Sequence, residues 1–444
     1  MVFVLVAVAV IALLAGVHRY VWRRFVGDTT APGSALRRAG TVAAFVLPLL
    51  SVGAMVSGRA GAPFWLQQVL AWPGFLWLAA LLYLTLALLA GEAVRPVLRR
   101  VLDRRDRAAA RRTESEVSAE AGTGPRTEAR NRNDALVPSG APSHAPRTPE
   151  PDGAADPAPA PASSAPSLAL PSRRLFVARA VGGAAAVAGL ATVGYGTHGV
   201  LRGPRVKRVT VPLAKLPRSA HGYRIAVVSD IHLGPILGRA HTRRIVDTIN
   251  RTRPDLIAVV GDLVDGSVAD LGTAAEPLAG LEARHGSYFV TGNHEYFSGA
   301  AQWVDHVREL GLHPLENARV EIDGFDLAGV NDVAGESEGQ GPDFVRALGD
   351  RDRGRASVLL AHQPVVIHDA VEHGVDLQLS GHTHGGQLWP GNLLAGLANP
   401  TVAGLERFGD TQLYVSRGAG AWGPPVRVGA PSDITVVELA SRQA

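Results

Sequence analysis

The chain has 444 residues, a formal net charge of +4 and no cysteine. This length accommodates two ordinary domains, or one domain and a membrane region. The lack of cysteine excludes disulfides and thiolate metal sites. Only 19% of the residues are charged. The arginines gather beside apolar segments, and this distribution favours a membrane surface as the partner of the basic residues. We expect no nucleic-acid binding, because no basic face with interleaved aromatic residues is visible.

Three apolar runs fill residues 1–102, and we assign this region to the membrane. We expect transmembrane helices at about 2–22, 41–57 and 70–92, since each run is long enough to cross the hydrocarbon core. No basic residue precedes the first run. A cleaved secretory signal peptide would carry such a residue, so we favour a retained span.

Residues 103–172 are expected to form a disordered linker, because Ala, Pro, Ser, Arg and Glu dominate them and cannot build a core. A fourth, Gly- and Ala-rich run at 173–200 begins with Arg173 and Arg174. Two interpretations of this arginine pair stay open. It is either part of a twin-arginine export signal that also anchors the chain, or a pair of ordinary topogenic charges before a membrane helix.

The distribution of arginine predicts the orientation of the spans. The segments 18–40 and 95–174 are rich in arginine, and the positive-inside rule places both in the cytoplasm. Four spans then put the chain after about residue 200 on the other side. The sequence therefore predicts a multi-pass protein of the cell membrane with an extracytoplasmic domain at 205–441. The bias toward Ala, Gly and Arg is typical of a high-GC bacterial genome.

The C-terminal domain alternates strand and helix signals, which indicates an α/β fold class. Apolar runs at 224–229 and 256–260 flank a helical stripe at 243–251, and this βαβ unit places Asp230 and Asp262 at the carboxyl ends of strands. Further strands are expected at 287–290, 325–330, 357–360, 375–379, 413–416 and 434–439.

Five short polar motifs follow these strands, so we expect them to meet at one sheet edge. The glycines before Asp262, Asn293 and His382 are expected to turn the chain sharply, since glycine accepts positive φ. The motifs are Asp230-Ile231-His232, Gly261-Asp262, Gly292-Asn293-His294-Glu295, His362 and Gly381-His382-Thr383-His384.

With these motifs, residues 205–441 resemble the calcineurin-like metallophosphoesterase superfamily, and in particular its membrane-associated bacterial branch. Gly292 to Tyr296 and Gly381 to Gln387 carry the resemblance most clearly. It implies a double β-sandwich flanked by helices and two divalent metal ions (Mn, Fe or Zn). It assigns Asp230, His232 and His384 to one ion, Asn293, His362 and His382 to the other, and Asp262 to both as a bridge.

The resemblance also implies the chemistry. Carboxylate and imidazole ligands suit these ions, which lower the pKa of a shared water so that a bridging hydroxide attacks the phosphorus of a phosphate ester. His294 is expected to be catalytic and to stabilise charge on the phosphoryl and leaving oxygens. Glu295 is expected to orient His294. We interpret Asp265 as a turn residue and Arg427 as structural or solvated.

The sequence therefore predicts a membrane-anchored, metal-dependent phosphoesterase, with a lipid-linked or envelope substrate such as a phospholipid. The apolar residues of Gln387-Leu388-Trp389-Pro390 and Ala421-Trp422 lie near the predicted site and suit acyl chains or simple packing. A nucleotide phosphodiesterase is one alternative. A catalytically silent metal-binding membrane scaffold is another, which the complete ligand set and His294 disfavour.

Overall fold

The computed structural model describes residues 2–121 and 173–442. Contacts among the described residues define two compact units, one formed by the residues up to Gly91 together with those from Val181 onward, the other by the described residues within 92–180. The first unit holds the apolar helices and an α/β domain, and these are the parts that build the functional site.

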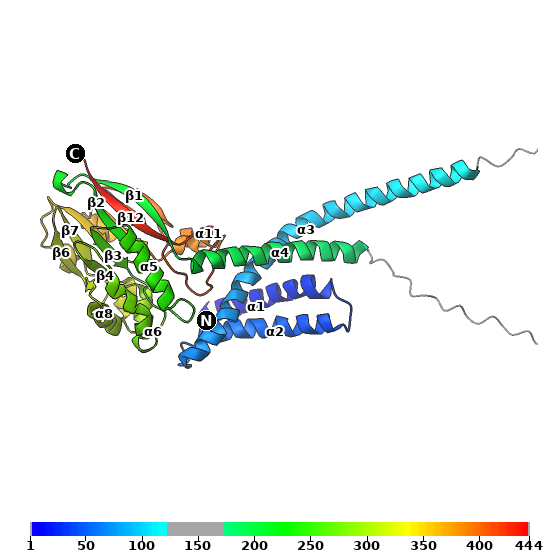
Figure 1. The fold of residues 1–444 in the computed structure, drawn as a ribbon, viewed down its shortest axis with the longest axis horizontal. Coiled ribbons are helices and arrows are strands. Elements are labelled where there is room, and N and C mark those ends of the chain that lie inside the picture. Colours follow the sequence, from blue (N-terminus) through cyan, green and yellow to red (C-terminus); the bar gives the residue numbers. More distant parts are fainter. Residues whose placement is uncertain (1, 122–172, 443–444) are drawn as a thin grey trace, which may run out of the picture. The chain divides into compact units, whose positions relative to one another are not determined.

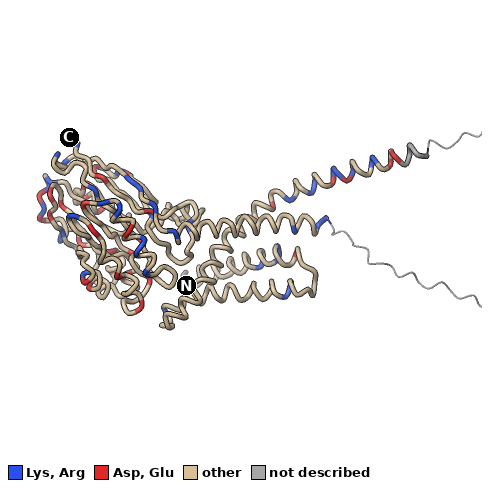
Figure 2. Tube along the Cα trace, in the orientation of Figure 1, with Lys and Arg blue, Asp and Glu red and all other residues tan. Residues whose placement is uncertain are grey.

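Four helices are long and apolar enough to cross a membrane. They are α1 (Val2–Trp22), α2 (Ala35–Val56), α3 (Phe64–Ala121) and α4 (Arg173–Leu201). Charged residues are sparse along α1, α2 and α4 and dense on the later part of α3 (Figure 2). The helices coincide with the four apolar runs of the sequence, which confirms the prediction of long apolar helices before the α/β domain.

Helix α3 extends further than the sequence suggested. It continues to Ala121, so residues 103–121 are helical although we predicted a linker from residue 103. Ala, Arg and Glu dominate this stretch, and all three are strong helix formers that continue a helix already nucleated by the apolar run. The rest of the predicted linker, 122–172, lies outside the described residues.

The α/β domain contains two six-stranded mixed sheets (Figure 1). The first sheet has the order β1 (Arg205–Leu213), β12 (Asp433–Ser441), β2 (Tyr223–Val228), β3 (Leu256–Val260), β4 (Ser287–Val290) and β5 (His313–Pro314). The second has the order β10 (Gly404–Phe408), β11 (Thr411–Val415), β9 (Leu377–Ser380), β8 (Ala356–Leu360), β7 (Phe325–Gly329) and β6 (Ala318–Ile322).

Helices cover the outer face of each sheet. The first sheet packs against α5 (Arg239–Arg251), α6 (Val268–Ala275) and α8 (Ala300–Glu309). The second packs against α9 (Phe344–Leu348) and α10 (Ile367–Glu372). The remaining helices are α7 (Asn293–Ser298), α11 (Gly391–Ala398), a π-helical turn at Arg23–Gly27 and 3₁₀ turns at Arg218–Ala220, Glu276–Gly280, Val333–Glu338, Pro364–Val366 and His384–Gly386.

The inner faces of the two sheets pack against each other to form the central core. In β2, Ile225 and Val227 belong to this core, whereas Ala226 and Val228 pack under the helices. Successive strand residues point to opposite faces, and residues 225–228 are buried on both faces, so all four of them are apolar. The predicted double β-sandwich flanked by helices is confirmed.

Candidate metal centre

The predicted site residues come from both sheets, and not from one sheet edge as we expected. The first sheet contributes residues that lie shortly after the ends of β2, β3 and β4, namely Asp230, Asp262 and Asn293. The second sheet contributes His362 after β8 and His382 after β9. The neighbouring strands in each group are parallel, so their carboxyl ends share an edge. The stacking of the sheets brings these two edges together.

Several of these residues adopt a backbone conformation that side chains normally avoid. Positive φ angles of 51°, 48°, 54°, 71° and 53° occur at Asp230, His232, Asp262, His382 and His384. Such left-handed conformations cost free energy in residues other than glycine and gather at functional sites. Five of the seven predicted metal ligands are therefore held by tight turns at strand ends.

The glycines before the ligands differ from expectation. Only Gly261 has the predicted positive φ, of 72°, whereas φ at Gly292 is −106° and Gly381 is also outside the positive region. Gly292 and Gly381 are required because of close approach. An added Cβ would overlap the carboxylate of Asp262 at the first and that of Asp230 at the second.

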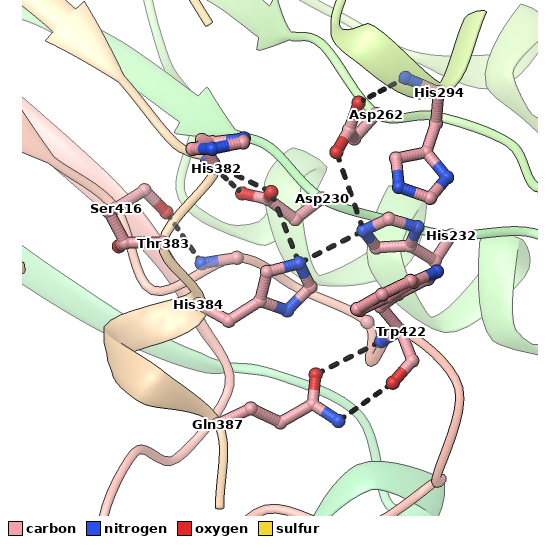
Figure 3. A network of polar contacts seen from close by, with 12 residues as sticks. Asp230, His232, Asp262, His294, His382, Thr383, His384, Gln387, Ser416 and Trp422 are labelled. Carbon is pink, nitrogen blue, oxygen red and sulfur yellow. Dashed lines mark hydrogen bonds and ion pairs between the residues drawn. The ribbon is translucent and has the colours of Figure 1, made fainter. Parts of the chain in front are cut away.

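The side chains converge on one buried cluster (Figure 3). His232 Nε2 lies 3.0 Å from His384 Nε2, which lies 3.4 Å from Asp230 Oδ1. His362 Nε2 lies 3.1 Å from Asp262 Oδ2, and His382 Nδ1 lies 3.1 Å from Asn293 Oδ1. Three groups have ligand atoms within 4.8 Å of one another: Asp230, His232 and His384; His232, Asp262 and His294; and Asp262, His362 and His382.

The histidine hydrogen bonds fit a role in metal binding. His362 Nδ1 lies 2.9 Å from the carbonyl oxygen of Val260, to which it donates, so the buried Nε2, 3.1 Å from Asp262 Oδ2, is the ring nitrogen left for a metal ion. His232 Nδ1 lies 2.8 Å from Asp265 Oδ1. A ligating histidine generally donates its other ring N–H to such an oxygen, which fixes the tautomer. The residues present therefore fit a centre for two divalent ions.

Burial and charge shape the titration of the cluster. Burial opposes ionisation of Asp262, but the neighbouring His362, together with His232 and His294, holds its pKa below the usual range. Burial also opposes protonation of His232, yet Asp265 raises the pKa of that imidazole to about 9. The pKa of Asp230 is raised by burial. The centre thus holds the carboxyl groups of Asp230 and Asp262 away from water, where a bound cation would favour their ionised form.

Asp265 has a larger role than the sequence suggested. We interpreted it as a turn residue, but its Oδ1 lies 2.8 Å from His232 Nδ1 and 2.7 Å from His294 Nδ1. Burial raises the pKa of this carboxyl, and His232 and His294 outweigh that effect and hold it at about 2. One carboxylate therefore orients both a predicted metal ligand and the predicted catalytic histidine. The only sign of this orienting role in the sequence was the position of Asp265, three residues after Asp262.

Glu295 contacts backbone N–H groups and, contrary to our expectation, does not orient the ring of His294. The ring of His294 contacts Asp265 instead. The Glu295 carboxylate accepts hydrogen bonds from the backbone N–H groups of Gly292, Leu263 and Asp262, at 2.6, 2.8 and 3.0 Å. The side chain is fully buried, and burial raises its pKa to about 7. Glu295 thus ties the turn after β3 to the start of α7, the two segments that carry Asp262 and Asn293.

Arg427 supports the proposed ligand His384. Its guanidinium donates to the carbonyl oxygens of Gly420 and His384 at 2.7 and 3.0 Å, and Nη2 lies 3.1 Å from His384 Nδ1. The side chain is buried, and burial lowers its pKa to about 10. This is the structural alternative that we considered for Arg427.

The metal centre opens into a cavity of about 1000 Å³. Asp262, Asn293, His294, His382 and His384 contribute to its wall. The wall also contains apolar side chains, among them Leu82, Phe297, Leu393, Leu394 and Trp422, and one arginine, Arg59. The cavity therefore places polar ligands and an apolar surface within reach of one bound molecule.

Comparison with known proteins agrees with this geometry. The family model for calcineurin-like phosphoesterases matches residues 223–386. The chain is 39% identical over 259 residues to a "Transmembrane protein with metallophosphoesterase domain" from Danio rerio, covering 55% of this chain and 59% of that protein. It is 38% identical over 256 residues to an "Uncharacterized metallophosphoesterase" from Helicobacter pylori, covering 56% of this chain and 68% of that one.

A further "Uncharacterized metallophosphoesterase", from Aquifex aeolicus, is 35% identical over 240 residues, which cover 53% of this chain and 91% of that protein. The chain thus spans nearly the whole of this bacterial relative but only about three fifths of the zebrafish relative. Similar proteins occur in animals as well as bacteria, so the resemblance is wider than the bacterial branch named above. The ligand geometry and these similarities lead to one conclusion: the chain belongs to the calcineurin-like metallophosphoesterases.

Proposed function

We propose that residues 205–441 hydrolyse a phosphate ester with two divalent ions (Mn, Fe or Zn) bound between the two sheets. One observation carries the proposal: ligand-type side chains from both sheets meet in one buried cluster, in which three groups have their ligand atoms within 4.8 Å of one another. The proposed ligands are Asp230, His232 and His384 for one ion, Asn293, His362 and His382 for the other, and Asp262 for both.

Each part of the site has a distinct role in this proposal. When bound, the two ions supply Lewis-acid polarisation of the phosphoryl group and a water of lowered pKa. Asp265 accepts a hydrogen bond from His294 Nδ1 and so presents the other ring nitrogen, Nε2, to a phosphoryl or leaving oxygen. His294 is the catalytic residue that stabilises charge there and delivers a proton to the leaving oxygen. Glu295 holds the two ligand-bearing turns together.

Apolar residues in the cavity wall support a lipid-linked substrate, such as a phospholipid. Leu82, Leu393 and Leu394 lie in the same wall as Asp262 and His294. An apolar pocket with a few convergent polar groups is the usual form of a site for an amphiphilic ligand.

A nucleotide phosphodiesterase is the second candidate, and a different observation favours it. The rings of Phe297 and Trp422 lie 5.5 and 5.7 Å from the ring of His294 and are 69% and 57% exposed. Exposed aromatic rings beside a phosphate site suit stacking with a base. A panel of nucleotide diesters beside phospholipids in mixed micelles separates the two candidates by their kcat/KM.

We also propose that the α/β domain lies on the extracytoplasmic side of the membrane. Arg59, in the connection between α2 and α3, lines the same cavity as Asp262. That connection therefore lies on the same side as the domain, as the four-span arrangement requires. A reporter fused after residue 205 is expected to behave as exported, and cytoplasmic reporter activity there would contradict the arrangement. Use of the twin-arginine pathway through Arg173 and Arg174 stays a prediction.

The activity test uses the full-length protein in detergent, with bis-p-nitrophenyl phosphate and p-nitrophenyl phosphate as substrates. We expect turnover with Mn²⁺ that chelation abolishes and that His294→Ala strongly reduces. If a folded, metal-loaded wild-type protein hydrolysed neither these esters nor phospholipids, or if His294→Ala retained full turnover, the proposed mechanism would be wrong. The silent scaffold would then be favoured.

A further inference from the structure

Helix α11, between β9 and β10, presents an apolar and exposed surface. The side chains of Leu393, Leu394 and Leu397 are 65%, 71% and 86% exposed, and no residue of the helix is buried. No Asp, Glu, Lys or Arg occurs between His384 and Glu406. Adjacent exposed leucines without neighbouring charge are typical of an interaction surface.

The segment leading into α11 contacts helix α3 within the run that we assign to the membrane. The hydroxyl of Tyr83 donates a hydrogen bond of 3.0 Å to the carbonyl oxygen of Trp389. Leu388 packs against an apolar cluster that includes Ala79 and Leu84 of α3. The exposed leucines therefore begin only four residues after a direct contact with a membrane helix. Trp389 is itself 53% exposed, and tryptophan is enriched at the membrane–water interface.

The cavity of the metal centre reaches this same surface. Leu393 and Leu394 of α11 and Leu82 of α3 all line it. Arg59, which follows α2, adds a positive charge to the wall. The part of the cavity wall that α3 and α11 form thus presents side chains that favour hydrocarbon, whereas the ligands of the metal centre favour a phosphate.

We infer that α11 inserts into the lipid leaflet beside α3, and that a phospholipid reaches the metal centre directly from this leaflet between the two helices. The acyl chain then contacts Leu82, Leu393 and Leu394, and the phosphate ester lies at the metal ligands with Arg59 nearby. Insertion removes the exposed leucines from water, which is the driving force for interfacial helices. The route of the substrate rests on the proposed phosphoesterase function, but the insertion of α11 does not.

The first test measures insertion, and the absence of native cysteine makes it direct. Full-length Leu397→Cys, labelled with an environment-sensitive fluorophore, is reconstituted in phosphatidylcholine and phosphatidylglycerol vesicles with or without brominated acyl chains. We expect brominated lipid to quench the label at least about twofold, as for an interfacial helix. Val345→Cys on α9 is the matched control, since Val345 is also an exposed apolar residue, at 71%, and its label is expected to stay unquenched.

Equal, weak quenching of both labels would overturn the insertion of α11. Efficient disulfide formation between two copies of Leu397→Cys would also overturn it, because a second copy of the chain would then cover the helix instead of lipid.

The second test addresses the route of the substrate with Leu397→Asp, because Leu397 belongs to α11 but is not among the residues that line the cavity. We expect unchanged turnover of a water-soluble p-nitrophenyl ester and a fall of about tenfold for a phospholipid in vesicles, since a charge opposes insertion. Equal rates on phospholipid for the variant and the wild type would contradict the route. If the wild type hydrolyses neither substrate, the proposed function fails, whereas the quenching result still decides the insertion.

Discussion

The two sheets of the domain contribute different chemistry to the same centre. The first sheet supplies the carboxylates Asp230 and Asp262, the amide of Asn293, the imidazole of His232 and the orienting carboxylate of Asp265, whereas the second sheet supplies imidazoles only: His362, His382 and His384. Neither sheet alone assembles either proposed ligand set. The packing of the two inner faces is therefore a condition for the proposed metal binding, and bound metal would in turn stabilise that packing.

The largest effect is expected from Asp262, the one proposed ligand of both ions. Asp262→Asn removes a charge from both groups of donors, so we expect turnover to fall by about 1000-fold, measured with a p-nitrophenyl diester. The matched control is Asp255→Asn, at the other end of the same strand, where the carboxylate accepts a hydrogen bond from the backbone of Arg224. A similar loss of activity in both variants would show that folding, and not the bridge, is affected.

Metal removal tests whether the centre holds the two sheets together. If each ion binds only the folded protein and its free concentration is about 100 times its Kd, each ion stabilises the protein by about 2.7 kcal/mol, and the two together by about 5.4 kcal/mol. Chelation is therefore expected to lower the Tm by roughly 10–20 °C, given a domain of this size. Near-UV circular dichroism of the full-length protein in detergent measures this shift. An unchanged Tm after complete loss of metal would show that the metal does not stabilise the packing of the two sheets.

A variant of Asp265 tests whether this residue binds metal itself or orients His232 and His294. Asp265→Asn keeps the shape of the side chain but removes the charge that faces His232 and His294, so we expect kcat/KM to fall about 10- to 100-fold with most of the metal retained. Metal content and the pH–rate profile, measured on the same variant, distinguish metal binding from orientation of the histidines. Loss of both ions would identify Asp265 as essential for metal binding, and an unaltered pH profile would contradict its action through His294.

We expect the smallest effect from a variant of Glu295, which tests whether this residue stabilises the connection between β3 and α7. In Glu295→Gln one carboxylate oxygen becomes an amide donor, which leaves backbone N–H groups without an acceptor. We expect a loss of about 1 kcal/mol in the free energy of unfolding, measured by urea denaturation. Glu309→Gln is the control, because Glu309 is exposed. A catalytic defect in Glu295→Gln without any loss of stability would favour a direct role in the reaction.

The local structure of the site could be predicted from the sequence because strand ends carry a clear signal. The runs before Gly261 and Gly292 match β3 and β4 residue for residue. The pairing of the strands into two sheets could not be predicted, because a continuous apolar run shows only that both faces are buried. The ligands were therefore expected at one sheet edge, when in fact two edges meet.

The supporting residues were harder to predict than the ligands. Asp265 and Glu295 are both acidic residues close to a proposed ligand, and their sequence positions do not distinguish a contact with a ring from a contact with backbone N–H groups. The structure reversed our expectation, since Asp265 contacts His294 and Glu295 binds the backbone. Such side-chain directions depend on the path of the turns after β3 and β4, which a strand pattern does not reveal.

The most direct test of the two-sheet metal centre is the number of metal ions per chain in single-ligand variants. We would load full-length wild type, His232→Ala from the first sheet and His362→Ala from the second with Mn²⁺ or Zn²⁺, remove free metal, and measure metal by mass spectrometry. We expect two ions in the wild type and one in each variant. Two ions in either variant, or a single ion in the wild type, would contradict a dinuclear centre built by both sheets.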